Sequence, residues 1–219
     1  MVELIRGLRA DQVLANLERV REQISAAGRD PSEVEILAAV KYVPAAELGA
    51  LAQAGVALLG ENRAQDLQAK ADGDPHGFTW DFIGALQSRK VRQILPYVRY
   101  IHSVASDSVL AQLGRHGTEA TQVMLEVNVA EEPGKSGISP SELPAFLERC
   151  PVSVVGLMTM PPLAAKPEDS RPHFAALRGL AERYRLRHLS MGTSQDYVVA
   201  VQEGATILRL GMILYTGAS

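Results

Sequence analysis

The chain has 219 residues, of which 47% are hydrophobic, so it can build one large core in the size range of single-domain α/β barrels. Its formal net charge is −3, no basic block stands out, and aromatic residues make up only 5%, so we expect no nucleic-acid partner. No stretch approaches 18 apolar residues, the N-terminus lacks a signal-peptide core, and there is one cysteine. We therefore expect a cytoplasmic protein with no membrane segment.

A helix is expected first, over about 11–27, because four apolar residues from Val13 to Ile24 recur at helical spacing. After it, short apolar runs alternate with amphipathic stretches. The apolar runs lie at 34–40, 56–59, 80–83, 98–101, 122–129, 152–157, 187–190 and 206–210. The helical stretches between and after them lie at 44–54, 62–72, 87–95, 106–116, 140–149, 167–185 and 195–203.

Eight strands that alternate with helices indicate a parallel sheet. Eight such units in 219 residues predict an α/β fold with a single (β/α)₈ TIM barrel over 1–219 and an extra N-terminal helix. The alternative is an open, doubly wound sheet. No G-x-G-x-x-G motif follows the first strand, which weakens that alternative.

Lys41 stands out among the lysines, of which there are five against seventeen arginines. It directly follows the buried-looking run 34–40, whereas Lys70 and Lys90 lie in polar helical stretches and are predicted to be solvated. A lysine amine at such a strand end loses hydration, which favours the neutral form that attacks carbonyls and forms Schiff bases. The alternative interpretation is a lysine that extends its amine from the strand end into solvent.

The loops after strands seven and eight suit a phosphate group. Barrel enzymes often bind phosphate there, and all strand-end residues meet at one mouth. Thr193 and Ser194 offer hydroxyls before a helix expected near Gln195, and Gly211 offers a bare backbone stretch. The alternative is ordinary helix capping by Ser194 and Asp196.

Arg209 lies near the end of the last buried strand, where a cation that does not deprotonate needs a partner. One interpretation is a structural ion pair with Glu61 or Glu126. The other is a donor to a bound ligand. A lysine, an arginine and a phosphate site around one mouth describe a pocket for a phosphorylated aldehyde, and pyridoxal 5′-phosphate (PLP) fits with its aldehyde on Lys41.

Several segments together resemble the YggS/PROSC family of PLP homeostasis proteins. Their order and spacing together make the resemblance specific. The segments are LAAVK at 37–41, GENRAQ at 60–65, FIGALQ at 82–87, HSV at 102–104, Asn128, KSG at 135–137, GLM at 156–158, LSMGTSQD at 189–196 and LRLG at 208–211.

The resemblance implies a barrel similar to the N-terminal domain of bacterial alanine racemase, with PLP held as a Schiff base on Lys41. It implies that Arg209 faces the pyridine nitrogen and that Asn62 lies near the ring. It implies neither catalytic residues nor a metal site. The predicted cofactor-binding residues are Lys41, Asn62, Thr193, Ser194, Arg209, Gly211 and Met212.

Two residues depart from the family pattern. Asp81 stands where the family usually has His, and Thr193 stands where it usually has Met. We expect Asp81 to affect local packing rather than PLP binding. Thr193 could alter the phosphate loop, although its backbone amide is unaffected.

We expect a monomeric protein of intracellular PLP homeostasis, which buffers the cofactor or delivers it to PLP-dependent apo-enzymes, and not an enzyme. Arg209 is a poor proton donor, so the ring would be a weak electron sink. The racemases also use a second domain with a Tyr base, for which a chain ending at Ser219 has no room. The alternatives are a racemase-like PLP enzyme of unknown specificity and a Schiff-base aldolase without cofactor.

Overall fold

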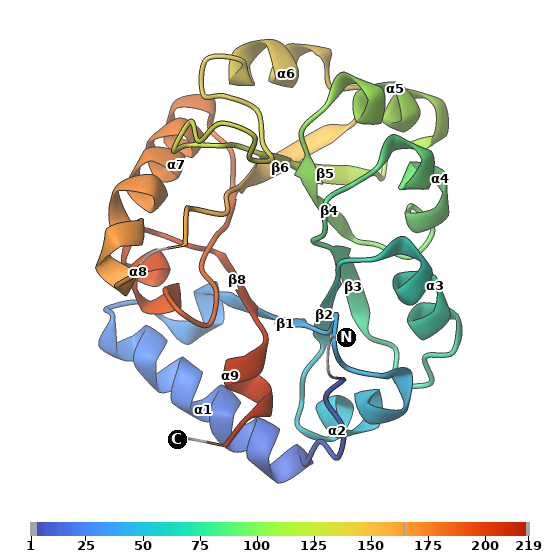
Figure 1. Ribbon diagram of the computed structural model, residues 1–219, viewed down its shortest axis with the longest axis vertical. Coiled ribbons are helices and arrows are strands. Elements are labelled where there is room, and N and C mark those ends of the chain that lie inside the picture. Colours follow the sequence, from blue (N-terminus) through green and yellow to red (C-terminus); the bar gives the residue numbers. More distant parts are fainter. Residues whose placement is uncertain (1–3, 164, 218–219) are drawn as a thin grey trace.

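The computed structural model describes residues 4–163 and 165–217, and its eight parallel strands close into a barrel (Figure 1). The strands pair in chain order, and the first strand also pairs with the last, which closes the sheet. The strands are β1 (Glu35–Ala39), β2 (Leu58–Glu61), β3 (Thr79–Phe82), β4 (Tyr100–Val104), β5 (Gln122–Glu126), β6 (Ser153–Met158), β7 (His188–Ser190) and β8 (Ile207–Leu210). The predicted (β/α)₈ barrel is confirmed, and the doubly wound alternative is wrong.

Helices surround the barrel on its outer side (Figure 1). Every predicted helical stretch contains a helix, with ends that shift by a few residues. The α-helices are α1 (Ala10–Ala26), α2 (Leu48–Gln53), α3 (Ala64–Asp72), α4 (Val91–Ile94), α5 (Asp107–His116), α6 (Leu143–Arg149), α7 (Arg171–Tyr184), α8 (Tyr197–Gln202) and α9 (Met212–Tyr215). Short 3₁₀ turns occupy Pro31–Glu33, Ala45–Glu47, Ser88–Lys90 and Pro167–Ser170.

The predicted N-terminal helix is α1, and it covers the part of the barrel where the sheet closes (Figure 1). Its apolar stripe is buried against α2, α8 and the unpredicted one-turn helix α9. Asn16 on α1 is buried and donates its amide to the carbonyl oxygens of Leu214 and Thr216, at 3.1 and 2.9 Å. The extra helix therefore fixes the chain that follows the last strand.

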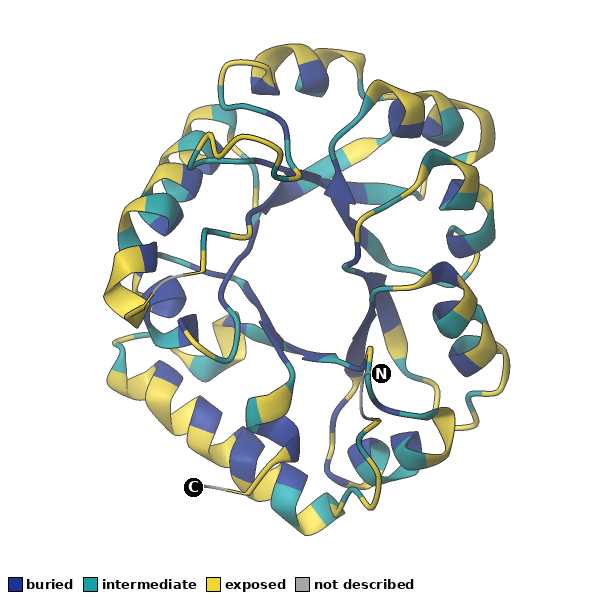
Figure 2. Cartoon of the chain, in the orientation of Figure 1, coloured by how far each residue is buried: buried dark blue, intermediate teal, exposed yellow. Residues whose placement is uncertain are grey.

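The core has two layers because successive strand residues face opposite sides of the sheet. On β1, Leu37 packs inside the barrel, and Ala38 packs outward against the helices. Figure 2 shows the buried strands and the helices with one buried and one exposed face. In the described ranges 4–163 and 165–217, none of the helices combines the length and apolar character needed to cross a membrane.

The prediction that Lys70 is solvated is wrong. This lysine is buried on the inner face of α3, where it pairs with Glu61 at the end of β2. Its amine also donates to the carbonyl oxygen of Val40 at 2.7 Å. The carboxylate of Glu61 is fully buried and accepts from the backbone amide of Asn62 at 2.6 Å, so the ion pair also holds the turn after β2.

Asp81 lies inside β3 and is fully buried. Its carboxylate accepts hydrogen bonds from Arg99 at 2.7 Å and from the backbone amide of Tyr100 at 3.1 Å, and it lies 3.1 Å from the Nε2 atom of His102. Burial alone would raise the pKa of Asp81, but its bonds to His102 and Arg99 outweigh burial and lower it. Asp81 thus places a charged carboxylate in the barrel interior.

Candidate functional site

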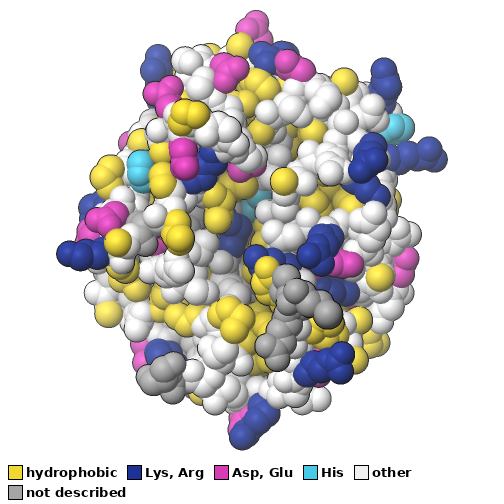
Figure 3. All heavy atoms as spheres, in the orientation of Figure 1, with side chains coloured by type: hydrophobic (Ala, Val, Ile, Leu, Met, Phe, Trp, Pro, Cys, Tyr) yellow, Lys and Arg dark blue, Asp and Glu magenta, His cyan; other side chains and the backbone are white. Residues whose placement is uncertain are grey.

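A cavity of about 570 Å³ opens at the carboxyl ends of the strands. This volume lies within the range of small-molecule sites. Figure 3 shows the hollow at the middle of this face, with basic side chains inside it and apolar side chains around it. Its lining includes all seven predicted cofactor-binding residues, namely Lys41, Asn62, Thr193, Ser194, Arg209, Gly211 and Met212.

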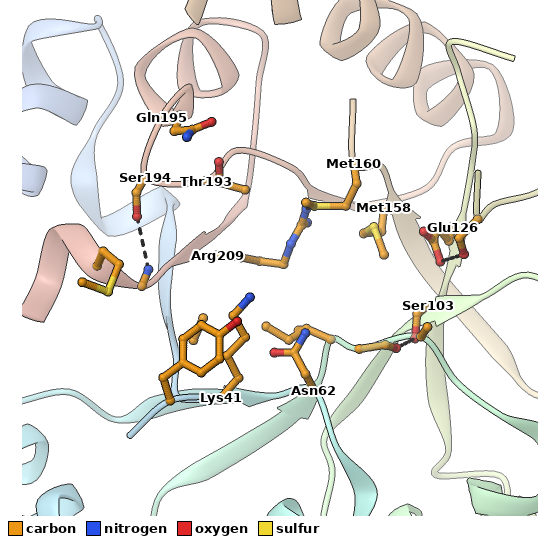
Figure 4. Close-up of a pocket in the computed structure, with 18 of the residues that line it drawn as sticks. Lys41, Asn62, Ser103, Glu126, Met158, Met160, Thr193, Ser194, Gln195 and Arg209 are labelled. Atoms are coloured by element: carbon orange, nitrogen blue, oxygen red, sulfur yellow. Dashed lines mark hydrogen bonds between the residues drawn. The ribbon is translucent and has the colours of Figure 1, made fainter. Parts of the chain in front are cut away.

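Lys41 follows β1 and lines the cavity (Figure 4). The prediction that its amine loses hydration at the strand end is wrong, because the residue is exposed. Its Nζ atom lies 4.6 Å from the centre of the Tyr42 ring, a cation–π distance. The amine is therefore accessible to a carbonyl compound in the cavity, and the surrounding apolar wall alone does not dehydrate it.

The loops after β7 and β8 meet at the part of the cavity next to Lys41, because β8 pairs with β1 (Figure 4). The backbone amide of Gly211 lies 3.4 Å from the Ser194 hydroxyl, in a long hydrogen bond. Ser194 makes no capping bond to α8, which begins at Tyr197 rather than near Gln195. Asp196 instead accepts from the Thr193 amide at 2.8 Å and shapes the loop. The two loops thus present hydroxyls and backbone to one space, and capping does not explain Ser194.

Arg209 on β8 lines the same cavity, and its side chain extends toward Met160 (Figure 4). It is buried, and in the described part of the chain it makes no ion pair. Its guanidinium donates to Ser190 Oγ at 2.6 Å, to the carbonyl oxygen of Thr159 at 2.9 Å and to Met160 Sδ at 2.8 Å. Burial lowers the pKa of Arg209 to about 10, so the group stays protonated near neutral pH. The predicted ion-pair alternative is wrong, since Glu61 pairs with Lys70 and Glu126 accepts from Ser136 instead of Arg209.

Two polar residues at the strand ends do not line the cavity. His102 is fully buried in the barrel interior, and the Thr159 hydroxyl is buried on the carbonyl oxygen of Val127 at 2.8 Å. Ser103, the next residue after His102, does line the cavity.

The sequence indicates Glu126 only as a partner for Arg209, but Glu126 lines the cavity itself. It is buried and accepts from the Ser136 hydroxyl at 2.9 Å. Burial raises the pKa of Glu126, although Ser136 and the charge of Arg209 oppose the rise. Sequence analysis also missed Tyr215 on α9, which lines the cavity and donates to the carbonyl oxygen of Ala39 at 3.1 Å. The helix α9 is a single turn, which is too short to show a helical period of apolar residues in the sequence.

Comparison with known proteins assigns this barrel to a class. The sequence model of the alanine racemase N-terminal domain matches residues 8–219. The chain is also 36% identical to the pyridoxal phosphate homeostasis protein of Aquifex aeolicus over 213 residues, which cover 91% of this chain and 93% of that one. The corresponding protein of Pseudomonas aeruginosa is 36% identical, with 94% of each chain covered. The chain belongs to the pyridoxal phosphate homeostasis protein family.

Solved structures agree with this assignment. PipY of Synechococcus elongatus, whose structure is described as having PLP bound, superposes with a TM-score of 0.80 and is 32% identical. The alignment covers 93% of this chain and all of PipY. A lysine/ornithine decarboxylase from Vibrio vulnificus shares only the fold, with a TM-score of 0.70 and 14% identity.

Proposed function

We propose that the protein binds PLP and serves in PLP homeostasis, with residues 1–219 acting as one barrel domain. The observation that carries the proposal is the arrangement of three features around one cavity: the accessible amine of Lys41, the double loop at Ser194 and Gly211, and the buried cation of Arg209. The match to curated homeostasis proteins over nine tenths of the chain supports it.

The residues present fit this cofactor. Lys41 supplies the amine for the aldehyde, and Ser194 with the backbone at Gly211 and Met212 suits the phosphate. Asn62 is informative because the residue lines the same cavity, and its buried Oδ1 atom has no hydrogen-bond partner within the described residues. A buried acceptor without a donor costs free energy, so a ligand that carries a hydroxyl or N–H group there would relieve it.

The carrier role follows from the basic residue that faces the ring in this proposal. PLP acts as an electron sink for carbanions when its pyridine nitrogen is protonated. Arg209 keeps its own proton near neutral pH and so cannot supply one to the nitrogen. Glu126 is the one carboxyl among the described lining residues, and burial raises its pKa, which makes it the residue to examine for acid/base chemistry. PLP-dependent apo-enzymes are the recipients we propose.

Little or no proton exchange on amino acids is expected from the loaded protein. The measurement is NMR of the α-hydrogen of L-alanine in deuterated water, together with release of PLP to an apo-enzyme. We expect no exchange and reversible release. Exchange on the order of 1 s⁻¹ or faster that is lost in Lys41→Ala or Glu126→Gln would contradict the carrier role. It would show that the protein is a racemase-like enzyme. A spectral shift with alanine alone does not distinguish the two.

Ser194→Ala is expected to weaken PLP binding by roughly ten- to a hundredfold, because it removes a hydrogen bond to a charged phosphate worth about 1.5–3 kcal/mol. Pyridoxal, which lacks the phosphate, should bind far more weakly than PLP to the wild type. Titration followed by absorbance measures both. Ser108→Ala is the control, since Ser108 is exposed on α5. Equal affinities for pyridoxal and PLP would show that these loops bind no phosphate.

A further inference from the structure

A continuous series of polar side chains crosses the barrel interior and ends at the cavity. It begins at the amino ends of the strands, where Arg99 donates to Glu35 at 2.6 Å and to Asp81 at 2.7 Å. Asp81 lies 3.1 Å from His102 Nε2, and His102 Nδ1 lies 2.8 Å from Ser190 Oγ. The series ends where Ser190 Oγ accepts from Arg209 at 2.6 Å, completing what we call the interior chain (Arg99, Asp81, His102, Ser190 and Arg209).

The chemistry of these groups fixes the direction of each hydrogen bond. A carboxylate only accepts, so His102 must carry its proton on Nε2 and donate to Asp81. Burial lowers the pKa of His102 despite the attraction of Asp81, so the ring is neutral and its Nδ1 is an acceptor. The Ser190 hydroxyl therefore donates to His102, and its oxygen keeps its lone pairs for Arg209.

Because Ser190 donates to His102, its oxygen is free to accept from the guanidinium of Arg209. Arg209 has five N–H groups in a rigid fork. Ser190 takes one at Nη1, and the Thr159 carbonyl and Met160 sulfur are bonded at Nη2. The Nε–H and the second Nη1–H have no partner in the part of the chain that the structure describes. The contacts at Ser190 and Thr159 thus decide which donors remain for a ligand in the cavity.

We propose that Asp81, His102 and Ser190 are positioning residues, whose directional hydrogen bonds hold the Arg209 fork so that its remaining N–H groups are presented to an acceptor atom of the bound ligand. This inference rests on the proposed function, in which the acceptor is the pyridine nitrogen. All three residues are buried at 0% exposure, so none of them contacts solvent. Asp81 also supplies the negative charge within the interior chain, which has a cation at each end, Arg99 and Arg209.

The first test needs no ligand. Two-bond ¹H–¹⁵N NMR of the ligand-free protein, with His102 assigned by its loss in His102→Asn, reports which ring nitrogen carries the proton. The interior chain requires a neutral ring protonated at Nε2 at pH 7. A proton on Nδ1, or on both nitrogens, would overturn the proposal because Ser190 could then not donate to His102.

The second test separates positioning from packing at Ser190. Ser190→Ala should weaken PLP binding about tenfold, the order expected for a lost hydrogen bond to a charged donor, while Ser190→Thr, which keeps the hydroxyl, restores most of it. Thermal unfolding is measured on the same samples. A Ser190→Ala variant that melts earlier but binds PLP like the wild type would show a purely structural residue and overturn the proposal. If the wild type itself binds no PLP, the proposed function fails, and the NMR result alone decides on the interior chain.

Discussion

Lys41→Ala is expected to lower the affinity for PLP by roughly a hundredfold or more, equivalent to about 3 kcal/mol. The substitution removes the amine that bonds the aldehyde, whereas Ser194, Gly211 and Arg209 remain in place. The variant should keep its fold, because Lys41 is exposed and makes no hydrogen bond within the described residues. Titration with PLP, followed by its absorbance and by filtration of the bound fraction, measures the effect.

Lys135→Ala is the matched control. Lys135 lies in the loop after β5, next to the cavity-lining Ser136, and its amine pairs with Glu132 at 3.1 Å. It should bind PLP like the wild type. Loss of binding in Lys135→Ala, with Lys41→Ala unaffected, would move the attachment point to the β5 loop.

Lys70→Met is expected to destabilise the protein by about 3–5 kcal/mol, the usual cost of leaving one partner of a buried ion pair unpaired. For a chain of this size that corresponds to roughly 6–20 °C in the melting temperature. The reason is Glu61, which is 0% exposed and loses its only cationic partner among the described residues. Urea unfolding, with the slope compared between variants, measures the change in the free energy of unfolding.

Two further variants check the cause. Lys90→Met removes a half-buried lysine whose amine bonds only to Gln93 among the described residues, so it should change stability by about 0.5 kcal/mol or less. Adding Glu61→Gln to Lys70→Met removes the unpaired charge and should recover part of the loss. Equal, small effects of Lys70→Met and Lys90→Met would contradict the assignment of the buried pair.

The sequence predicted those features that depend on local pattern. The eight strands, the barrel and α1 followed from runs and spacings of apolar residues. The seven residues predicted to bind cofactor line one cavity, because strand-end positions in a barrel meet at one mouth. Their contacts with a cofactor remain a proposal.

Features that depend on tertiary partners could not be predicted. A polar helical stretch gives no sign that Lys70 faces inward onto Glu61. His102 meets Ser190 across 88 residues of sequence, and Tyr215 meets Ala39 across 176. The exposure of Lys41 likewise depends on the open shape of the cavity rather than on the strand before it.

The most direct test of the central claim is to find the atom that holds PLP. The purified protein is loaded with PLP, reduced with borohydride, digested and mapped by peptide mass spectrometry, and its absorption spectrum is recorded before and after reduction. We predict visible absorption that borohydride abolishes, and a pyridoxyl adduct on Lys41. An adduct chiefly on Lys135, or a colourless protein without any adduct, would contradict the proposed PLP site.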